Sequence, residues 1–164
     1  MSLIALAALA LAQNAECGLS SEMVWSGDPA AGLHVRAQSH CDGKGAVEVS
    51  LTFTNADGEV LDRQTYVKDQ VMLLAWSGGA AFQGALDDWL DHMNRPRPTS
   101  ELPGLCEPSE FPFLRDENLS EADYEALRAG NRNMLCYVQG MESERCLILE
   151  DGALVDVGIQ IFPG

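Results

Sequence analysis

The sequence predicts an α+β protein in which an antiparallel sheet of about six strands, arranged as two meanders, carries two amphipathic helices on one face. Two regions of alternating polarity, one towards each end of the chain, predict the meanders. Between them, two stretches with apolar residues at helical spacing predict the helices. A parallel sheet requires strands and helices to alternate along the chain, and here they do not.

The first meander begins with residues 33–38 and 47–54, in which apolar and polar side chains alternate. This pattern is typical of strands with one buried and one solvated face. Gly43 and Gly45 lie between the two segments and favour a turn there, since glycine accepts positive φ.

A third strand is predicted after the turn sequence Asn-Ala-Asp-Gly at residues 55–58. A three-residue loop places Phe53 opposite Leu61, whereas a two-residue loop places it opposite Asp62, and the apolar pairing favours the longer loop. The longer loop also puts Arg63 on the inner face. There its guanidinium needs a carboxylate partner or must reach past the strand end, because an unpaired buried charge is very costly.

The first helix is predicted over residues 80–94. Its apolar stripe consists of Phe82, Leu86, Trp89, Leu90 and Met93. Its solvated side carries Asp87, Asp88 and Asp91. Arg95-Pro96 ends the helix, because proline restricts the residue before it and lacks an amide proton. The apolar run 71–76 fits a short helix and a strand equally well.

Residues 95–118 form a long loop that holds five of the seven prolines and shows no regular period. Loops of this length inside compact domains are usually functional or tethered. Cys106 is the predicted tether. We therefore expect the exposed aromatic residues of this loop, Phe111 and Phe113, to take part in binding a partner.

The second helix is predicted to begin after Ser120, an N-cap residue, and to run for about ten residues. Gly130 or Asn131 can take the left-handed conformation that ends it.

The second meander ends in a hairpin whose two-residue turn is Asp151-Gly152. Counting back from this turn sets Cys146 opposite Val157, on the apolar face. Cys136 points into the same apolar layer. An odd number of residues in the preceding loop places Cys136 directly opposite Cys146, whereas an even number offsets the two.

The chain contains five cysteines: Cys17, Cys41, Cys106, Cys136 and Cys146. Their spacings match no C-x-x-C redox or zinc pattern, so structural disulfides are expected. Five thiols form at most two bridges, and the spacing leaves their connectivity open. Pairing of Cys41 with Cys17 is one arrangement, and a reactive odd thiol is the alternative to purely structural use.

Residues 3–12 are all apolar and end in Ala10-Leu11-Ala12, the small-x-small pattern that signal peptidases cut. The segment is too short to span a bilayer, which takes about 20 residues. Residues 1–12 are therefore predicted to be a signal peptide, and residues 13–164 a single exported domain, periplasmic or secreted, with no membrane span. Because Met1-Ser2 carry no Lys or Arg, a buried N-terminal helix or a misplaced start codon is the alternative.

The chain has 25 acidic and 10 basic residues and a formal net charge of −15. Such a surface repels phosphate backbones and anionic headgroups, so no nucleic-acid partner is expected. It attracts basic proteins, although dispersed acidity also serves solubility alone.

Patterns typical of catalytic or metal sites are weak throughout. The histidines His34, His40 and His92 lack a metalloprotease spacing, and the sequence contains no Gly-x-Ser-x-Gly elbow and no phosphate-binding glycine loop. We therefore expect no metal and no cofactor.

These features favour a non-enzymatic, extracytoplasmic binding or inhibitor-like protein. We expect it to engage a basic protein or another envelope component through its loop and its acidic surface. Two alternatives stay open: a small hydrolase that uses a histidine with a carboxylate or a free cysteine, and a structural envelope subunit.

Overall fold

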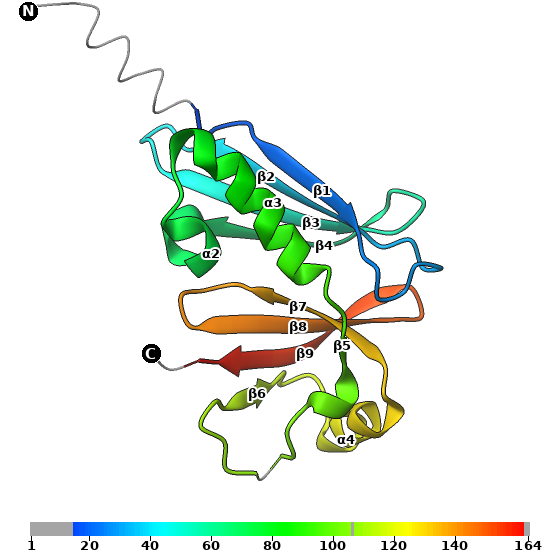
Figure 1. Ribbon diagram of the computed structural model, residues 1–164. Coiled ribbons are helices and arrows are strands. Elements are labelled where there is room, and N and C mark those ends of the chain that lie inside the picture. The colour runs from blue at the N-terminus through cyan, green and yellow to red at the C-terminus, as the bar shows by residue number, and fades with distance from the viewer. Residues whose placement is uncertain (1–14, 106, 163–164) are drawn as a thin grey trace, which may run out of the picture.

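The structure is a computed structural model that describes residues 15–105 and 107–162. The predicted α+β class is confirmed, because these residues form two antiparallel sheets and a few helices (Figure 1). The predicted signal peptide, residues 1–12, and the predicted tether, Cys106, lie outside the described residues.

The first sheet contains the first meander and has the strand order β1-β2-β3-β4. Its strands are β1 (Ser20–Val24), β2 (His34–Cys41), β3 (Val47–Thr54) and β4 (Val60–Val67). Strand β1 pairs with β2 and was not predicted. A disulfide between Cys17 and Cys41, one of the arrangements the sequence leaves open, joins the segment before β1 to the end of β2, with Cα atoms 5.5 Å apart.

The second meander forms a separate sheet with the order β5-β7-β8-β9-β6, where a single sheet was predicted. Its strands are β5 (Arg97–Pro98), β6 (Phe113–Arg115), β7 (Asn133–Val138), β8 (Ser143–Glu150) and β9 (Ala153–Ile161). The two sheets meet through side chains rather than a shared backbone ladder. A helix that packs against both β1 and β7 crosses from one sheet to the other (Figure 1).

The helices are α2 (Met72–Ala75), α3 (Phe82–Met93) and α4 (Glu121–Gly130), with short 3₁₀ turns η1 (Lys68–Gln70), η2 (Gly79–Ala81) and η3 (Thr99–Glu101). The undecided apolar run thus becomes the one-turn helix α2. Helix α3 matches the predicted first helix closely. None of the helices in the described ranges has the length and apolar character needed to cross a bilayer.

The two amphipathic helices lie on opposite faces of the second sheet, not on one face as predicted. Helix α3 packs in the main core with Leu135, Tyr137 and Leu147. Helix α4 packs in a second core with Cys136 and Ile148, which point the other way. The physical reason is that every residue from 134 to 138 in β7 is buried, so both faces of this sheet need a cover.

The long loop 95–118 is less irregular than its sequence suggests. Strands β5 and β6 lie within it and pair with opposite edges of the second sheet, β5 with β7 and β6 with β9. Between them, the buried Thr99 donates from Oγ1 to the carbonyl of Leu127 at 2.6 Å. The described part of the loop is therefore held by backbone pairing and by α4.

A β-bulge in β4 makes the predicted register wrong beyond the turn. Thr54 still pairs with Val60, as the three-residue loop requires, but Phe53 then faces Asp62 instead of Leu61. Arg63 consequently lies on the outer face, where Nε donates to Thr52 Oγ1 at 3.3 Å, and not on the inner face. The bulge therefore avoids the cost of burying Arg63 on the inner face, because it places the guanidinium on the solvent-exposed face.

A second bulge lies in β9. The register from the Asp151-Gly152 turn holds as far as Leu147, and Cys146 then faces Gly158 instead of Val157. Gly158 has φ 146°, and a Cβ there would collide with the backbone of Leu114 in β6. Glycine therefore allows β6 to approach β9 closely.

The residues predicted to begin and end the second helix do so in α4. The amide of Asp123 donates to Ser120 Oγ at 3.1 Å, and Asn131 ends α4 with φ 48°. Cys136 lies directly opposite Cys146, the outcome of an odd loop that the sequence leaves open, and the two form a cross-strand disulfide with Cα atoms 4.1 Å apart.

Candidate functional site

The best-formed candidate site is a cleft on the part of the second sheet that α4 leaves uncovered. Cys136 in β7 lines its floor, and its volume is about 710 Å³. Ligand sites usually fall within about 300–1,000 Å³ and combine an apolar wall with a few polar groups. The turn between β7 and β8 and the end of β9 frame this region, at the left of Figure 1.

The apolar wall of the cleft comes from three segments. Met72 in α2, Met141 in the β7–β8 turn and Phe162 after β9 are each between 41% and 43% exposed. Backbone hydrogen bonds hold these segments together: the amide of Met72 donates to Gly140 at 3.2 Å, and that of Phe162 to Glu142 at 2.8 Å. The wall is therefore a fixed surface built from distant parts of the chain.

The polar end of the cleft centres on Glu144, which is only 5% exposed. Arg97 Nη1 donates to Glu144 Oε2 at 2.6 Å, while His92 Nε2 lies 3.4 Å from Oε1. A buried carboxylate requires such partners. The Arg97 contact is short, and the His92 contact is long, so Oε1 retains capacity to accept from a ligand.

Neither predicted loop aromatic lines the cleft itself, but Phe111 contacts Phe162, which does. The Phe111 ring packs on that of Phe162 with centroids 5.9 Å apart, and 42% of Phe111 is exposed. Phe113 instead packs against the buried Tyr124 of α4, with centroids 6.1 Å apart, as part of the second core. The structure therefore separates the two into a binding candidate and a core residue.

The predicted acidic face of α3 lies on the solvent side of that helix. Asp87 accepts from Gln83 at 3.0 Å, Asp91 pairs with Arg95 at 3.1 Å, and Asp88 is exposed. None of the three lines the cleft, although Arg95 does.

The cleft residues Met72, Met141, Phe162 and Glu144 are not singled out by the sequence. Met141 and Glu144 belong to the β7–β8 hairpin, and Met72 and Phe162 come from distant segments that meet it only in the folded chain. A weak signal existed at Met141, an apolar residue in a short polar connection between two strands.

The histidines offer little support for a nucleophilic mechanism. His40 Nε2 lies 3.1 Å from Glu48 Oε2, and His92 contacts Glu144. In the described part of the chain, neither histidine hydrogen-bonds to a serine or cysteine. Cys136, Glu144 and Cys146 present ligand atoms within 4.8 Å of one another, but the two sulfurs are joined in the disulfide and are not available to a metal.

A buried polar cluster links the two sheets. Arg145 in β8 pairs with Asp156 at 2.6 Å and with Asp62 of the first sheet at 3.3 Å. It also donates to Tyr137 at 3.1 Å, whose hydroxyl lies 2.9 Å from that of Tyr66. Burial raises the pKa of Asp156 and of both tyrosines, with Arg145 opposing the shift. Arg145 and its partners bridge the two sheets, although Asp156 Oδ1 is buried without a hydrogen-bond partner among the described residues, so the cluster serves as a structural link.

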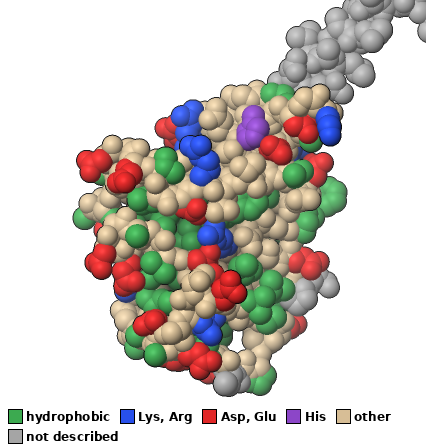
Figure 2. All heavy atoms as spheres, turned by 180° about the vertical axis from the view of Figure 1, so that it is seen from behind, with side chains coloured by type: hydrophobic (Ala, Val, Ile, Leu, Met, Phe, Trp, Pro, Cys, Tyr) green, Lys and Arg blue, Asp and Glu red, His purple; other side chains and the backbone are tan. Residues whose placement is uncertain are grey.

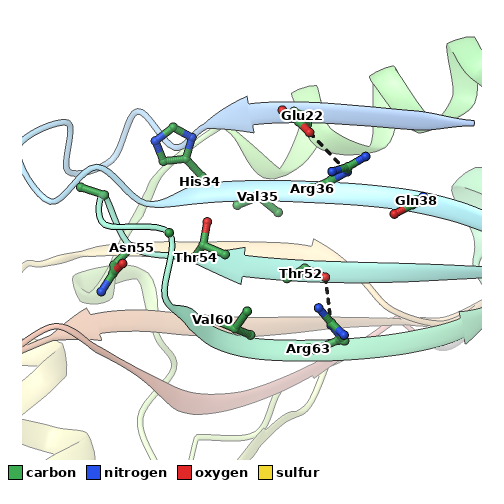
Figure 3. Close-up of a pocket in the computed structure, with 12 residues that line it drawn as sticks. Glu22, His34, Val35, Arg36, Gln38, Thr52, Thr54, Asn55, Val60 and Arg63 are labelled. Atoms are coloured by element: carbon green, nitrogen blue, oxygen red, sulfur yellow. Dashed lines mark hydrogen bonds and ion pairs between the residues drawn. The ribbon is translucent and has the colours of Figure 1, made fainter.

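A second pocket lies on the outer face of the first sheet and has a volume of about 430 Å³ (Figure 3). It contains Arg36 and Arg63 on either side of Thr52. On this side of the molecule, several basic side chains lie towards the first sheet, and acidic ones are spread over the whole face, including beside them (Figure 2).

Comparison of this chain with protein-family models, with curated proteins and with solved structures finds no match.

Proposed function

We propose that this chain is an exported binding protein that holds an apolar segment of a basic partner in the cleft of the second sheet. The observation that carries the proposal is the exposed wall of Met72, Met141 and Phe162 beside a buried carboxylate. Large apolar side chains that stay exposed around a concave site are typical of interaction surfaces.

The composition of the wall suits a peptide or protein segment. Methionine side chains are flexible and polarizable, so they adapt to apolar groups of different shapes. Trp76, four residues after Met72, is 85% exposed and adds a large apolar side chain to this region of the chain. Tryptophan often contributes strongly to binding at protein interfaces.

The charge of the molecule favours a basic partner. A formal charge of −15 attracts cations over long range, and Glu142 at the cleft adds to this. At close range, a partner Lys or Arg replaces the long His92 contact at Glu144 Oε1, while the apolar groups next to it enter the Met and Phe wall.

The compartment is supported by two features. The disulfides Cys17–Cys41 and Cys136–Cys146 fit an oxidising environment. The apolar leader predicted from the sequence indicates the same route.

The test is isothermal titration calorimetry with short synthetic peptides that alternate Leu or Phe with Lys, and with matched peptides in which Glu replaces Lys. We expect the Lys peptides to bind at least about tenfold more tightly, and their affinity to fall as salt rises from about 50 to 500 mM. Equal binding of both peptide series, or none, contradicts the proposal.

A pair of variants locates the binding site. Met141→Ser removes an exposed wall residue from a turn, and Leu114→Ser is the control, because Leu114 is 56% exposed on β6 and does not line the cleft. We expect M141S to weaken binding about tenfold, and L114S to change it less than about twofold. If both variants weaken binding equally, the cleft is not the site.

A further inference from the structure

We propose that the outer face of the first sheet binds a small hydroxylated carboxylate, the chemistry of a uronic acid, with its carboxylate between Arg36 and Arg63. This site is separate from the cleft and does not depend on the function proposed for it. Figure 3 shows the side chains that carry the inference.

The two arginines belong to one row across the sheet. Glu22 pairs with Arg36, Arg36 with Thr52, and Thr52 with Arg63. Because neighbouring strands lie about 4.8 Å apart, the arginine backbones lie about 10 Å apart with Thr52 midway. Two guanidinium groups at this separation can fold inward over Thr52 and each donate to one oxygen of a carboxylate.

Arg63 already takes this inward position. Its Nε donates to Thr52 Oγ1 at 3.3 Å, so the side chain lies along the exposed surface of the row and points towards Thr52 (Figure 3). It reaches the outer face only because of the bulge in β4. Bulges often re-aim a side chain next to a functional site, and this one places a second arginine in the pocket.

The rest of the pocket is suited to a hydroxylated body. Gln38 and Thr54 supply amide and hydroxyl groups, and His34 adds an imidazole beside Thr54. Val60 forms an apolar wall at the end of the pocket near the β3–β4 turn. The volume of about 430 Å³ is in the usual range for small-molecule sites.

The local charge contrasts with the molecule as a whole. The chain has 25 acidic and 10 basic residues, yet the pocket holds two arginines and one carboxylate, Glu22. The overall negative charge penalises a phosphate monoester, which carries about −1.5 to −2, more than a carboxylate, which carries a single charge. A singly charged carboxylate is therefore the better match.

Glu22 sets the affinity of this site. Its Oε1 lies 3.2 Å from Arg36 Nε, so it competes with the ligand for that guanidinium and repels an approaching carboxylate. Both side chains of the pair are at least half exposed, so the contact is weak and can be displaced.

The test is calorimetric titration of the full chain with glucuronate, glucose and acetate at matched ionic strength. We expect glucuronate to bind at least about tenfold more tightly than glucose, which lacks the carboxylate, and acetate, which lacks the hydroxyl groups. Equal affinity for glucuronate and acetate overturns the uronic-acid assignment, and no heat with any of the three overturns the site.

Variants test the named residues in both directions. Arg36→Gln and Arg63→Gln are each expected to weaken glucuronate binding about tenfold, whereas Glu22→Gln is expected to tighten it roughly two- to fivefold. Lys44→Gln, the same charge change in the β2–β3 turn outside the pocket, is the control and should change affinity less than about twofold.

The design separates local binding from general charge effects. If Lys44→Gln weakens binding as much as Arg63→Gln, or if Glu22→Gln leaves the affinity unchanged, the row does not hold the carboxylate. Circular dichroism of each variant checks that the fold is retained, which is expected because these side chains lie on the surface of the sheet.

Discussion

Replacing Arg145 by Met tests the buried link between the two sheets. The Arg145 side chain is 17% exposed, and the carboxylates it pairs, Asp62 and Asp156, are 24% and 26% exposed. The variant leaves two half-buried carboxylates next to each other without a cation. Removing one member of a buried ion pair costs about 3–5 kcal/mol, and the residual exposure here places the expected loss near the lower end, about 3 kcal/mol.

The pH dependence of this loss distinguishes charge from packing. Burial already raises the pKa of Asp156 in the presence of Arg145, and removal of the guanidinium raises that pKa further. A carboxyl group whose pKa is higher in the folded than in the unfolded state loses stability as pH rises from its unfolded pKa through its folded pKa. We therefore expect R145M to be markedly destabilised at pH 7 and less so at pH 4.

Urea unfolding followed by tryptophan fluorescence at both pH values measures the loss in free energy of unfolding. In a separate thermal unfolding experiment, the melting temperature is expected to fall by roughly 6–12 °C at pH 7. Arg95→Met is the matched control, because Arg95 and Asp91 are each 73% exposed and should contribute little. A loss for R145M below about 1 kcal/mol at pH 7, or the same loss at pH 4, would refute the reasoning.

Three further predictions concern single positions. Burial raises the pKa of Tyr124 to about 12, so the free energy of unfolding that its neutral hydroxyl contributes is complete below pH 10 and is lost as pH rises from 10 to 12. In urea unfolding, the free energy of unfolding should therefore fall between pH 9 and pH 11 by about 1.4 kcal/mol less in Tyr124→Phe than in the unmodified chain. Gly158→Ala should destabilise the fold by more than about 2 kcal/mol in the same assay, because φ is 146° and the new methyl group meets the Leu114 backbone, and an unchanged unfolding midpoint contradicts this. Ser120→Ala removes the N-cap of α4 and should cost about 1 kcal/mol, while Ser120→Asp should restore most of it.

The candidate cleft shows the limit of sequence reasoning about function. Phe111 is predicted to bind a partner because it lies in a long proline-rich loop, and its ring packs on Phe162, one of the residues that line the cleft. Phe113 carried the same signal but is needed in the core, where it packs on Tyr124. Phe113 begins β6 and Phe111 lies two residues before it, so the two differ mainly in what the folded chain places next to them.

The second pocket shows the same limit in a different way. The alternation of β2 and β3 places Arg36 and Thr52 on a solvated face without any knowledge of the fold. Arg63 was expected on the inner face, and only the bulge in β4 brings it into the row. A bulge of one residue changes the face of every side chain beyond it, and no local sequence pattern in the strand predicts the bulge.

What the sequence determined by itself was local. Three local features form as predicted, and each depends on residues within a few positions of one another. They are the Asp151-Gly152 turn, the N-cap of α4 at Ser120 and the left-handed residue Asn131 that ends α4. The α+β class follows from two distinct periodicities, which likewise need only short windows of the chain.

The tertiary structure decided what depends on contacts between distant segments. The two meanders separate into two sheets because α3 packs against both, and α4 takes the opposite face because the central strand β7 is apolar on both sides. The β4 bulge, in turn, brings Asp62 to the inner face, where it pairs with Arg145, and sends Arg63 outward. A buried charge must find its partner across the chain, and the free energy of that pairing acts only once the sheets have met.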